Sequence, residues 1–257
     1  MNMSVNNYSV RNGMYKAYSH LSSGKRINNA ADDAAGLAIG KKMQKQENGL
    51  RVGAQNAQEG MGVLNVADGA LGGITDSLQR IRDLALRSMN GLSSASDKAS
   101  YQKEIDQLKE GIQSTAKTTS LNEQKLLDGS MADMHLATNP DGTGMKIGMA
   151  NSTLESLGIA DLDVTSGNFS LDDIDNAIDM VSSQRSAMGA STNRLEYTYN
   201  NNTGASLEQL SSRSRIEDLD IPKAISEKKK EDLLGEYRNM MQRQRMNQNA
   251  MVLGLFH

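Results

Sequence analysis

Apolar residues recur every seven positions along the stretch from Ile27 to Asn90. The first track consists of Leu50, Ala57, Leu64, Leu71, Leu78 and Ala85, and the second of Ala54, Met61, Ala67, Ile74 and Ile81. This spacing predicts one helix that packs along its length against other helices. At about 1.5 Å per residue such a helix would span roughly 90 Å, which is too long for a compact globule of this chain length.

Nine glycines lie in the same stretch, between Gly36 and Gly73. Each costs roughly 1 kcal/mol in a helix relative to alanine, so this helix is a poor one by itself. Glycine lacks a side chain and lets a neighbouring backbone come close. We therefore expect the helix to depend on packing partners, within the chain and beyond it.

Shorter helical patterns lie on both sides of this seam. Residues 1–20 predict the frayed start of a helix, and a turn is expected at 22–24. The polar run 28–33 restarts a helix, with Asp32 and Asp33 in its first turn. After the seam, a helix at about 97–118 is predicted to lie antiparallel on the first one. Its cap comes from Ser94, Ser96 or Asp97, and its apolar face from Tyr101, Ile105, Leu108 and Ile112.

Helical periodicity stops between residues 126 and 169, where glycines punctuate the chain. The turn sequence at 139–142 (Asn-Pro-Asp-Gly) separates the apolar segments 134–136 and 145–147, which predicts a β-hairpin. Forty residues are enough for one small β-rich cap. We expect this cap at the far tip of the helical bundle.

A further helix of about forty residues is expected from Ser170 onward. Pro222, at a first helical position, separates it from a last helical segment at 223–256. The predicted fold is therefore mainly α, a long antiparallel helical bundle or coiled coil with a small β-hairpin region at mid-chain. The apolar stripe of the forty-residue helix consists of Ile174, Ile178, Val181, Met188, Leu195, Leu207 and Leu210.

Composition narrows the classes of function. The net charge of −3 favours neither nucleic acid nor an acidic membrane surface as a partner. No stretch of eighteen apolar residues is present, and the first twenty residues lack the apolar core of a secretory signal peptide. The chain has no cysteine, which excludes disulfides and thiolate metal sites. We expect a cytosolic protein, or one exported by a route that does not read such a signal.

Catalytic and metal-binding patterns are not recognisable. The histidines at 20, 135 and 257 lack metal-ligand spacing, and no Gly-x-Ser-x-Gly turn follows a strand. We therefore predict no enzyme, metal or cofactor. Arg80, Leu84 and Arg87 share one side of the long helix and, by periodicity alone, form an ordinary charged flank beside its core track.

Five sequence blocks closely resemble bacterial flagellins. They are Leu-Ser-Ser-Gly-Lys-Arg-Ile-Asn at 21–28, Ala-Asp-Asp-Ala-Ala-Gly-Leu-Ala-Ile at 31–39, Leu-Gln-Arg-Ile-Arg-Asp-Leu-Ala at 78–85, Asn-Arg-Leu-Glu-Tyr at 193–197 and Ser-Arg-Ile-Glu-Asp at 214–218. The resemblance covers roughly 19–129 and 169–256. Blocks this long, in this order and at both ends of the chain, are a specific signal.

The resemblance implies a structural subunit that self-assembles into the bacterial flagellar filament. In flagellins the terminal helices form an inner coiled-coil tube, and the neighbouring helices form an outer shell. This division assigns 1–30 and 217–257 to the inner tube, and 31–125 and 170–216 to the outer-shell helices, with the hairpin and loops at 126–169. The segment before Leu21 is shorter than in typical flagellins, so ordinary inner-tube packing is in doubt.

Self-association and export follow from the same resemblance. The implied partners are other copies of the chain, an export chaperone and export apparatus, and hook-associated and cap proteins. The subunit would be secreted without a cleaved signal peptide, with neither nucleic acid nor membrane as a partner. The residues expected to carry self-association are Tyr8, Tyr15, Tyr18, Leu233, Tyr237, Met240, Met241, Met251, Leu253 and Leu255.

The resemblance also implies contact with the host's flagellin-sensing Toll-like receptor. Arg80 and Leu84 match receptor-contacting positions of flagellins, and Gln79 and Arg87 lie alongside them. A glutamate of that surface is replaced by Gly111, with Glu110 one position off, where a side chain is rotated by about 100°. We expect partial binding and weak signalling.

Two alternatives remain at this point. A hook–filament junction protein would share the end patterns without polymerising indefinitely. A secreted receptor-binding module would work as a monomer.

Overall fold

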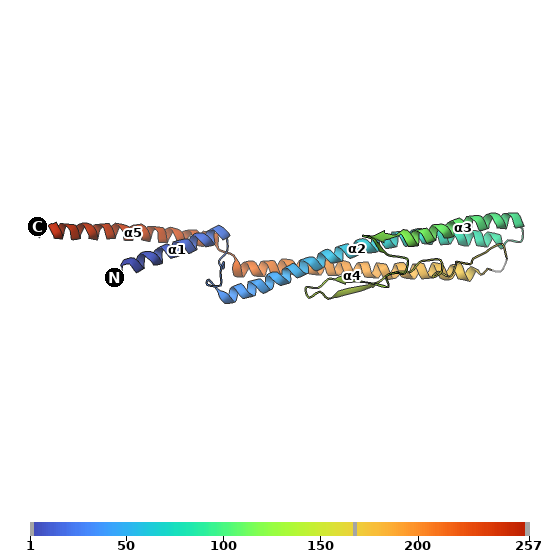
Figure 1. Cartoon of the computed structure of the whole chain (residues 1–257), viewed down its shortest axis with the longest axis horizontal. Helices are drawn as coiled ribbons and strands as arrows, with labels where there is room; N and C mark the ends of the chain where they lie inside the picture. The colour runs from blue at the N-terminus through green and yellow to red at the C-terminus, as the bar shows by residue number, and fades with distance from the viewer. Residues whose placement is uncertain (1–2, 167–168, 255–257) are drawn as a thin grey trace. The chain divides into compact units, whose positions relative to one another are not determined.

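Long helices make up most of the computed structural model, which describes the backbone of residues 3–166 and 169–254. Within these ranges the side chains are described except for 3–12, 249, 250 and 252–254. The helices are α1 (Met3–Ser23), α2 (Ala34–Ser88), α3 (Ala95–Thr118), α4 (Leu171–Glu217) and α5 (Ile221–Gly254) (Figure 1). The strands are β1 (Ser120–Leu121), β2 (Gln124–Lys125), β3 (Asp133–Ala137) and β4 (Gly144–Gly148).

The chain forms two compact units, and α2 and α4 contribute to both. The terminal unit comprises Met1–Glu47 and Leu207–His257, and the central unit comprises Asn48–Ser206. These boundaries differ from the layer boundaries near 30 and 216 that the resemblance implies. Those layers concern an assembly of many copies, so their boundaries stay a prediction.

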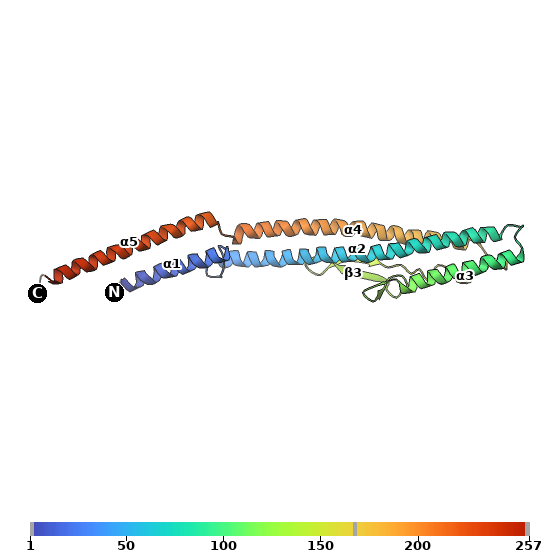
Figure 2. The ribbon, with the colours of Figure 1, turned by 90° about the horizontal axis from the view of Figure 1, so that it is seen from above.

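The central unit is built around the heptad seam of α2. Both tracks of the seam face inward, which confirms the packed helix predicted from the period of seven. Helices α3 and α4 run alongside α2 in Figures 1 and 2, and they add Ile105, Ile112 and Val181 to the same core. The mainly α architecture with its small β region is therefore confirmed.

The stripe of α4 ends earlier than predicted. Ile174, Val181 and Leu195 are buried, whereas Leu207 is 62% exposed and Leu210 is 43% exposed. At about 100° per residue these two leucines lie roughly 120° and 60° around the helix from Leu195. The prediction that they continue the buried stripe is wrong because their phase differs.

The start of α2 also differs from the prediction. The helix begins at Ala34, and Asp33 caps it by accepting a hydrogen bond from the backbone N–H of Gly36 (2.8 Å). Asp32 lies outside the first turn, and its Oδ2 accepts from the backbone N–H groups of Asn28 (3.0 Å) and Asn29 (3.1 Å). One acid therefore caps the helix while the other holds the preceding turn.

The cap of α3 follows the prediction. Ser94 Oγ accepts from the backbone N–H of Asp97, and the Asp97 carboxylate accepts from the backbone N–H of Ser94 in return. This reciprocal arrangement is a capping box, which satisfies two backbone donors at the start of the helix. The helix therefore begins at Ala95, two residues before the predicted start.

The predicted hairpin is present, but its position differs. Strands β3 and β4 pair antiparallel, with Met134 opposite Ile147. Asn56 of α2 and Asn202 of α4 donate side-chain hydrogen bonds to the Ala137 and Thr138 carbonyls, both at 2.7 Å. The hairpin therefore lies along the α2–α4 pair of the central unit, and its expected position at the tip is wrong.

A second, shorter hairpin was not predicted from the sequence. Strands β1 and β2 pair across Asn122 (φ 49°) and Glu123 (φ 67°), which both adopt the left-handed region. Turns of this kind usually contain Asn-Gly, and glutamate rarely adopts positive φ. The Asn-Glu dipeptide therefore gave no turn signal.

Candidate functional site

Helix α5 exposes an unusual number of large apolar side chains. Most of the residues predicted for self-association lie here, and all of those whose side chains are described are exposed. They are joined by others that the sequence analysis did not single out. The exposed apolar residues of α5 are Ile221, Ile225, Leu233, Leu234, Tyr237, Met240, Met241, Met246 and Met251.

One side of α5 faces α1, which runs antiparallel to it within the terminal unit. The ammonium nitrogen of Lys228 lies 4.7 Å from the centre of the Tyr18 ring, which is a cation–π contact. Lys228 also pairs with Asp232, with its Nζ 2.8 Å from Oδ2. At about 100° per residue, Ala224 and Gly235 lie within roughly 40° of Lys228. Between Ala224 and Gly235, the side of α5 that faces α1 is therefore polar or small.

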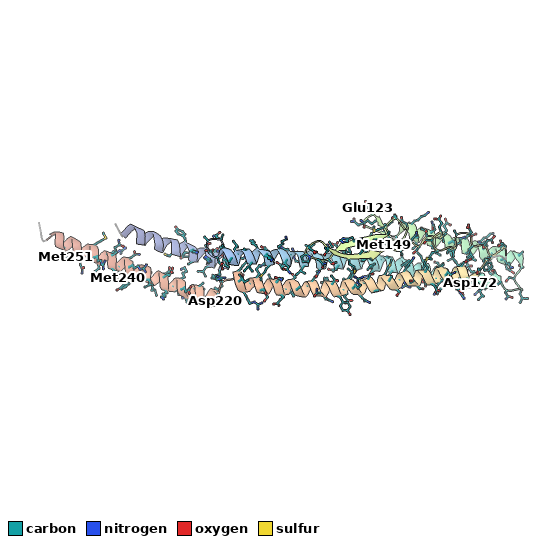
Figure 3. The ribbon with its side chains drawn as sticks, turned by 90° about the horizontal axis from the view of Figure 1, so that it is seen from below. Glu123, Met149, Asp172, Asp220, Met240 and Met251 are labelled. Carbon is teal, nitrogen blue, oxygen red and sulfur yellow. The ribbon has the colours of Figure 1, made fainter. Side chains whose placement is uncertain are left out.

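Most of the exposed apolar residues occupy the opposite side of α5, whereas Ile221, Ile225 and Met246 lie nearer the direction of Lys228. The other six lie within about 60° of the direction opposite Lys228 at roughly 100° per residue. We call this set the outer face of α5: Leu233, Leu234, Tyr237, Met240, Met241 and Met251. Met240 and Met251 are labelled on this helix in Figure 3. The helix thus turns its apolar side away from its partner in the chain, the reverse of an ordinary surface helix.

The predicted residues of α1 fall into different environments. Tyr15 is exposed, whereas the exposed ring of Tyr18 is in contact with Lys228 of the same chain. The side chains of Tyr8 and Leu253, and all of Leu255, lie outside the described residues. Leu234 was missed by the sequence analysis, although its helical phase beside Met241 would have identified it.

The two linkers that lead into α1 and α5 are joined to each other. Lys25 and Asp218 form an isolated antiparallel bridge, and the Leu219 N–H donates to the Gly24 carbonyl (2.9 Å). The buried Glu217 carboxylate pairs with Lys25 Nζ at 3.2 Å. The linker that follows α1 and the linker that precedes α5 are therefore held together by backbone hydrogen bonds and an ion pair.

Asp32 braces the α1–α2 linker. The Lys16 ammonium, 2.8 Å from Oδ1, lowers the pKa of this carboxyl well below its usual range, with a further contribution from the backbone N–H groups of Asn28 and Asn29. His20 Nε2 lies 3.5 Å from the same oxygen. Asp32 therefore stays ionised in the folded chain and holds the linker against α1.

The predicted receptor-contacting residues lie on α2 and α3. Arg80 Nη2 is 2.6 Å from Oε1 of Glu104, which joins the exposed sides of the two helices. Gln79 and Arg87 are exposed, but Leu84 is only 1% exposed and belongs to the core. The interpretation of Leu84 as part of a charged flank is therefore wrong.

The α3 part of the predicted receptor surface is accessible. Glu110 and Gly111 are both exposed, and a Cβ atom added at Gly111 would meet no neighbouring atom within 4 Å. The Arg80–Glu104 pair fixes the register of the two helices. Glu110 lies six residues further along α3, or about 9 Å at 1.5 Å per residue.

Among the described residues, no group of three or more His, Asp or Glu side chains is placed to hold a metal ion. Nor does any helix in the described part of the chain have the length and apolarity needed to cross a membrane. What these helices do offer is an apolar surface on α5 and a polar surface on α2 and α3.

The fold and the outer face of α5 together define the class of the molecule, a mainly helical protein that exposes an apolar helix face. Two family models match most of the chain: the bacterial flagellin N-terminal helical region at residues 1–132 and the bacterial flagellin C-terminal helical region at 171–256. The chain belongs to the bacterial flagellin family and is a structural subunit of the extracellular flagellar filament.

Individual relatives agree with this assignment. A flagellin of Halalkalibacterium halodurans is 37% identical over 246 residues, covering 93% of this chain and 90% of the relative. A flagellin of Bacillus subtilis is 35% identical over 292 aligned positions, covering 98% and 94%. The similarity therefore extends over nearly the whole of each relative.

Solved structures show the same fold. The crystal structure of Bacillus cereus flagellin is 29% identical with a TM-score of 0.51, covering 58% of this chain and 88% of that one. A putative flagellar hook-associated protein from Vibrio parahaemolyticus has a TM-score of 0.60 at 13% identity, covering 73% and 100%. At that identity the second likeness concerns the fold alone.

Proposed function

We propose that the outer face of α5 is the surface through which copies of this chain self-assemble into the filament. The observation that carries this proposal is that six large apolar residues lie on the side of α5 directed away from α1. Large apolar side chains gathered on one exposed face are typical of surfaces that bind another protein. Burial against a neighbouring copy would recover roughly 1.5–3 kcal/mol for each large side chain fully removed from water.

The exposed tyrosine of α1 extends the proposed surface. Tyr15 has no partner in the described part of the chain, and Tyr18 holds Lys228. Methionine and tyrosine are adaptable contact residues, which suits a surface that meets several neighbours in a tube. We therefore propose that α1 and α5 enter the assembly together.

Seeded elongation followed by electron microscopy tests this proposal. Purified chain is mixed with sheared filament fragments, and elongation is compared between wild type, Leu233→Ser and Met246→Ser. Leu233 is 66% exposed on the outer face, and Met246 is 64% exposed at the helical phase of Lys228, opposite that face, so the two substitutions remove similar exposed apolar groups. We expect Leu233→Ser to slow elongation strongly and Met246→Ser to leave it near the wild-type rate.

The outcomes separate the alternatives. Equal elongation by both variants would exclude the outer face as the contact surface. Failure of the wild type to elongate from its own seeds would favour a hook–filament junction protein. A monomeric receptor-binding module would keep its binding after deletion of the chain beyond Pro222.

A second proposal concerns the host's flagellin-sensing Toll-like receptor. We propose that the chain binds this receptor through the α2–α3 surface that carries Gln79, Arg80, Arg87, Glu110 and Gly111, and that it signals weakly. The support is that these residues are exposed, whereas Leu84 can act only through core packing. Because Glu104 already holds the Arg80 guanidinium, receptor binding would have to compete with this pair.

A receptor reporter assay tests this second proposal. Wild type is expected to show low potency. Gly111→Glu is expected to raise it because it restores the glutamate that Gly111 replaces, at a position where a Cβ meets no neighbour within 4 Å. Gly189→Glu, on α4, is the control because that glycine also has nothing within 4 Å. Full potency of the wild type would contradict the proposal.

Export completes the proposed function. We propose that the chain is secreted through a flagellar export apparatus with its chaperone, without a cleaved signal peptide, and meets hook-associated and cap proteins at the filament ends. Family membership supports this route. The intact mass of subunits recovered from filaments tests it, because removal of a leader longer than the initiator methionine would contradict the proposal.

A further inference from the structure

Methionine supplies half of the outer face of α5. Met240, Met241 and Met251 are 67%, 37% and 75% exposed, so these residues are open to small solutes in the free subunit. Elsewhere the chain also has buried methionines, such as Met145 and Met188 in the core of the central unit. Six described methionines are exposed, and three of them lie on the surface proposed for assembly; the other three are Met89, Met180 and Met246.

The sulfur chemistry of the chain is confined to thioethers. It contains sixteen methionines and no cysteine. No thiol is therefore present to consume an oxidant before it reaches the methionines. Exposed methionine is oxidised readily to the sulfoxide, whereas a side chain packed in a core is shielded.

We propose that Met240, Met241 and Met251 are oxidation sites through which peroxide controls assembly of the subunit. This inference rests on the proposed function of the outer face. Oxidation converts a flexible apolar side chain into a polar, chiral one. A sulfoxide oxygen buried at a subunit contact without a donor costs free energy, so oxidised subunits are disfavoured in the filament.

The chemical step is a two-electron oxygen transfer. The thioether sulfur attacks one oxygen of hydrogen peroxide, an S–O bond forms, and the O–O bond breaks. Sulfur is oxidised, the peroxide oxygen that leaves is reduced, and it departs as water after taking up the proton of the transferred hydroxyl. Methionine sulfoxide reductases reverse the change with a dithiol, which becomes a disulfide as water is released.

The state of assembly decides when this chemistry occurs. In the free subunit the three residues are exposed to solvent, whereas a neighbouring copy on the outer face would cover them. Oxidation is therefore expected before assembly and not after it. The site would act as a checkpoint on free subunits and leave existing filaments unaffected.

The matched control is Met246 on the same helix. It is 64% exposed, close to Met240, but lies at the same helical phase as Lys228, opposite the outer face. The two positions should therefore react with peroxide at similar rates. Only oxidation on the outer face should affect assembly.

Seeded elongation after graded treatment with hydrogen peroxide tests the proposal. Site occupancy is measured by peptide mass spectrometry in wild type, in the triple variant Met240→Leu/Met241→Leu/Met251→Leu, and in Met246→Leu. Each oxidised sample is compared with its own untreated sample. We expect oxidation to slow elongation of the wild type and of Met246→Leu by about tenfold or more, and of the triple variant by less than about twofold.

Repair of the wild type provides a test without any substitution. Treatment of oxidised wild-type subunits with methionine sulfoxide reductases A and B, which act on the two sulfoxide epimers, should restore elongation. Preformed filaments treated with the same peroxide should retain unmodified sulfur at 240, 241 and 251. If the triple variant fails to assemble at all, the reductase treatment and the protection of methionine in preformed filaments still test the oxidation proposal.

The outcomes distinguish this inference from the proposed function. Untreated wild type that does not elongate contradicts the filament contact itself. Untreated wild type that elongates, but loses nothing when the three methionines are oxidised, overturns the oxidation proposal alone. Loss of elongation that tracks Met246 occupancy would also overturn it.

Discussion

The guanidinium of Arg185 on α4 forms a bidentate pair with the carboxylate of Asp68 on α2, with Nε 2.8 Å from Oδ1 and Nη2 3.4 Å from Oδ2. Arg82 of α2 and Asp175 of α4 make the same kind of pair with the signs reversed. A slide of one helix along the other by a single turn would separate both pairs. Two pairs of opposite polarity therefore favour one register of the antiparallel helices.

The first prediction is that the ion pairs between α2 and α4 contribute much less to the stability of the central unit than its buried leucines do. Arg185→Ala should lower the free energy of unfolding by less than about 1 kcal/mol, because both partners are partly exposed to water. Leu71→Ala should cost about 2–5 kcal/mol, because Leu71 is fully buried and leaves a cavity. Urea unfolding followed by circular dichroism measures both. Equal losses would show that the ion pair contributes more than its exposure allows.

The heptad seam was predictable because a period of seven is a property of one segment alone. Leu64, Leu71 and Leu78 repeat without interruption, and any partner that packs on them buries the same face. The hairpin at 133–148 was predictable for the same reason, since its turn and its apolar alternation are local. These elements needed no knowledge of what surrounds them.

The positions of the elements relative to each other were not predictable in this way. Asn202 binds the hairpin through one hydrogen bond between residues far apart in the sequence. No sequence pattern predicts such a bond, and the hairpin was therefore expected at the tip. Leu84 has charged neighbours in the sequence, which suggested an exposed flank, but its position around the helix places it in the core. The outer face of α5 could be defined only after Lys228 was found against Tyr18, because the sequence does not say which side α1 covers.

Two glycines of α2 should respond in opposite directions to alanine. A Cβ at Gly53 would clash with the Thr138 carbonyl oxygen, so Gly53→Ala must displace the hairpin. Gly69 has nothing within 4 Å, and Gly69→Ala should stabilise the helix by up to about 1 kcal/mol. Thermal unfolding should therefore show a lower melting temperature for the first variant and a higher one for the second. A gain at Gly53 would mean that the close approach is absent in solution.

Acid should weaken the terminal unit through Asp32. Because Lys16 and the linker N–H groups lower its pKa in the folded chain, the unfolded chain binds more protons in acid. The stabilisation by Asp32 is therefore fully present above its ordinary pKa of about 3.9 and is lost as pH falls towards the lowered folded value. Asp32→Asn should remove this part of the acid dependence.

Measurement of unfolding from about pH 6 down to about pH 2.5, a range that spans the ordinary carboxyl pKa, checks this prediction. The difference in stability between wild type and Asp32→Asn should shrink as the pH falls. The comparison is repeated with His20→Gln in both chains, because His20 lies near the same carboxylate. A difference that stays constant across this range would show that the Lys16 contact does not persist in solution.

The attachment of the hairpin to α4 depends on Asn202. This buried side chain donates through Nδ2 to the Thr138 carbonyl at 2.7 Å, so Asn202→Leu leaves a buried acceptor without its donor. We expect a loss of about 1–3 kcal/mol in unfolding free energy. Asn200→Leu, at an exposed position two residues earlier on α4, is the control and should change stability by less than about 0.5 kcal/mol. Hydrogen exchange provides a second measurement. In Asn202→Leu the β3 and β4 amides should exchange faster than in wild type, whereas the amides of the α2 seam should exchange at the wild-type rate. The reason is that the hairpin loses its hydrogen bond to α4 while the heptad core is unchanged. Uniform acceleration over the whole central unit would show instead that the hairpin and the helices unfold as one cooperative body.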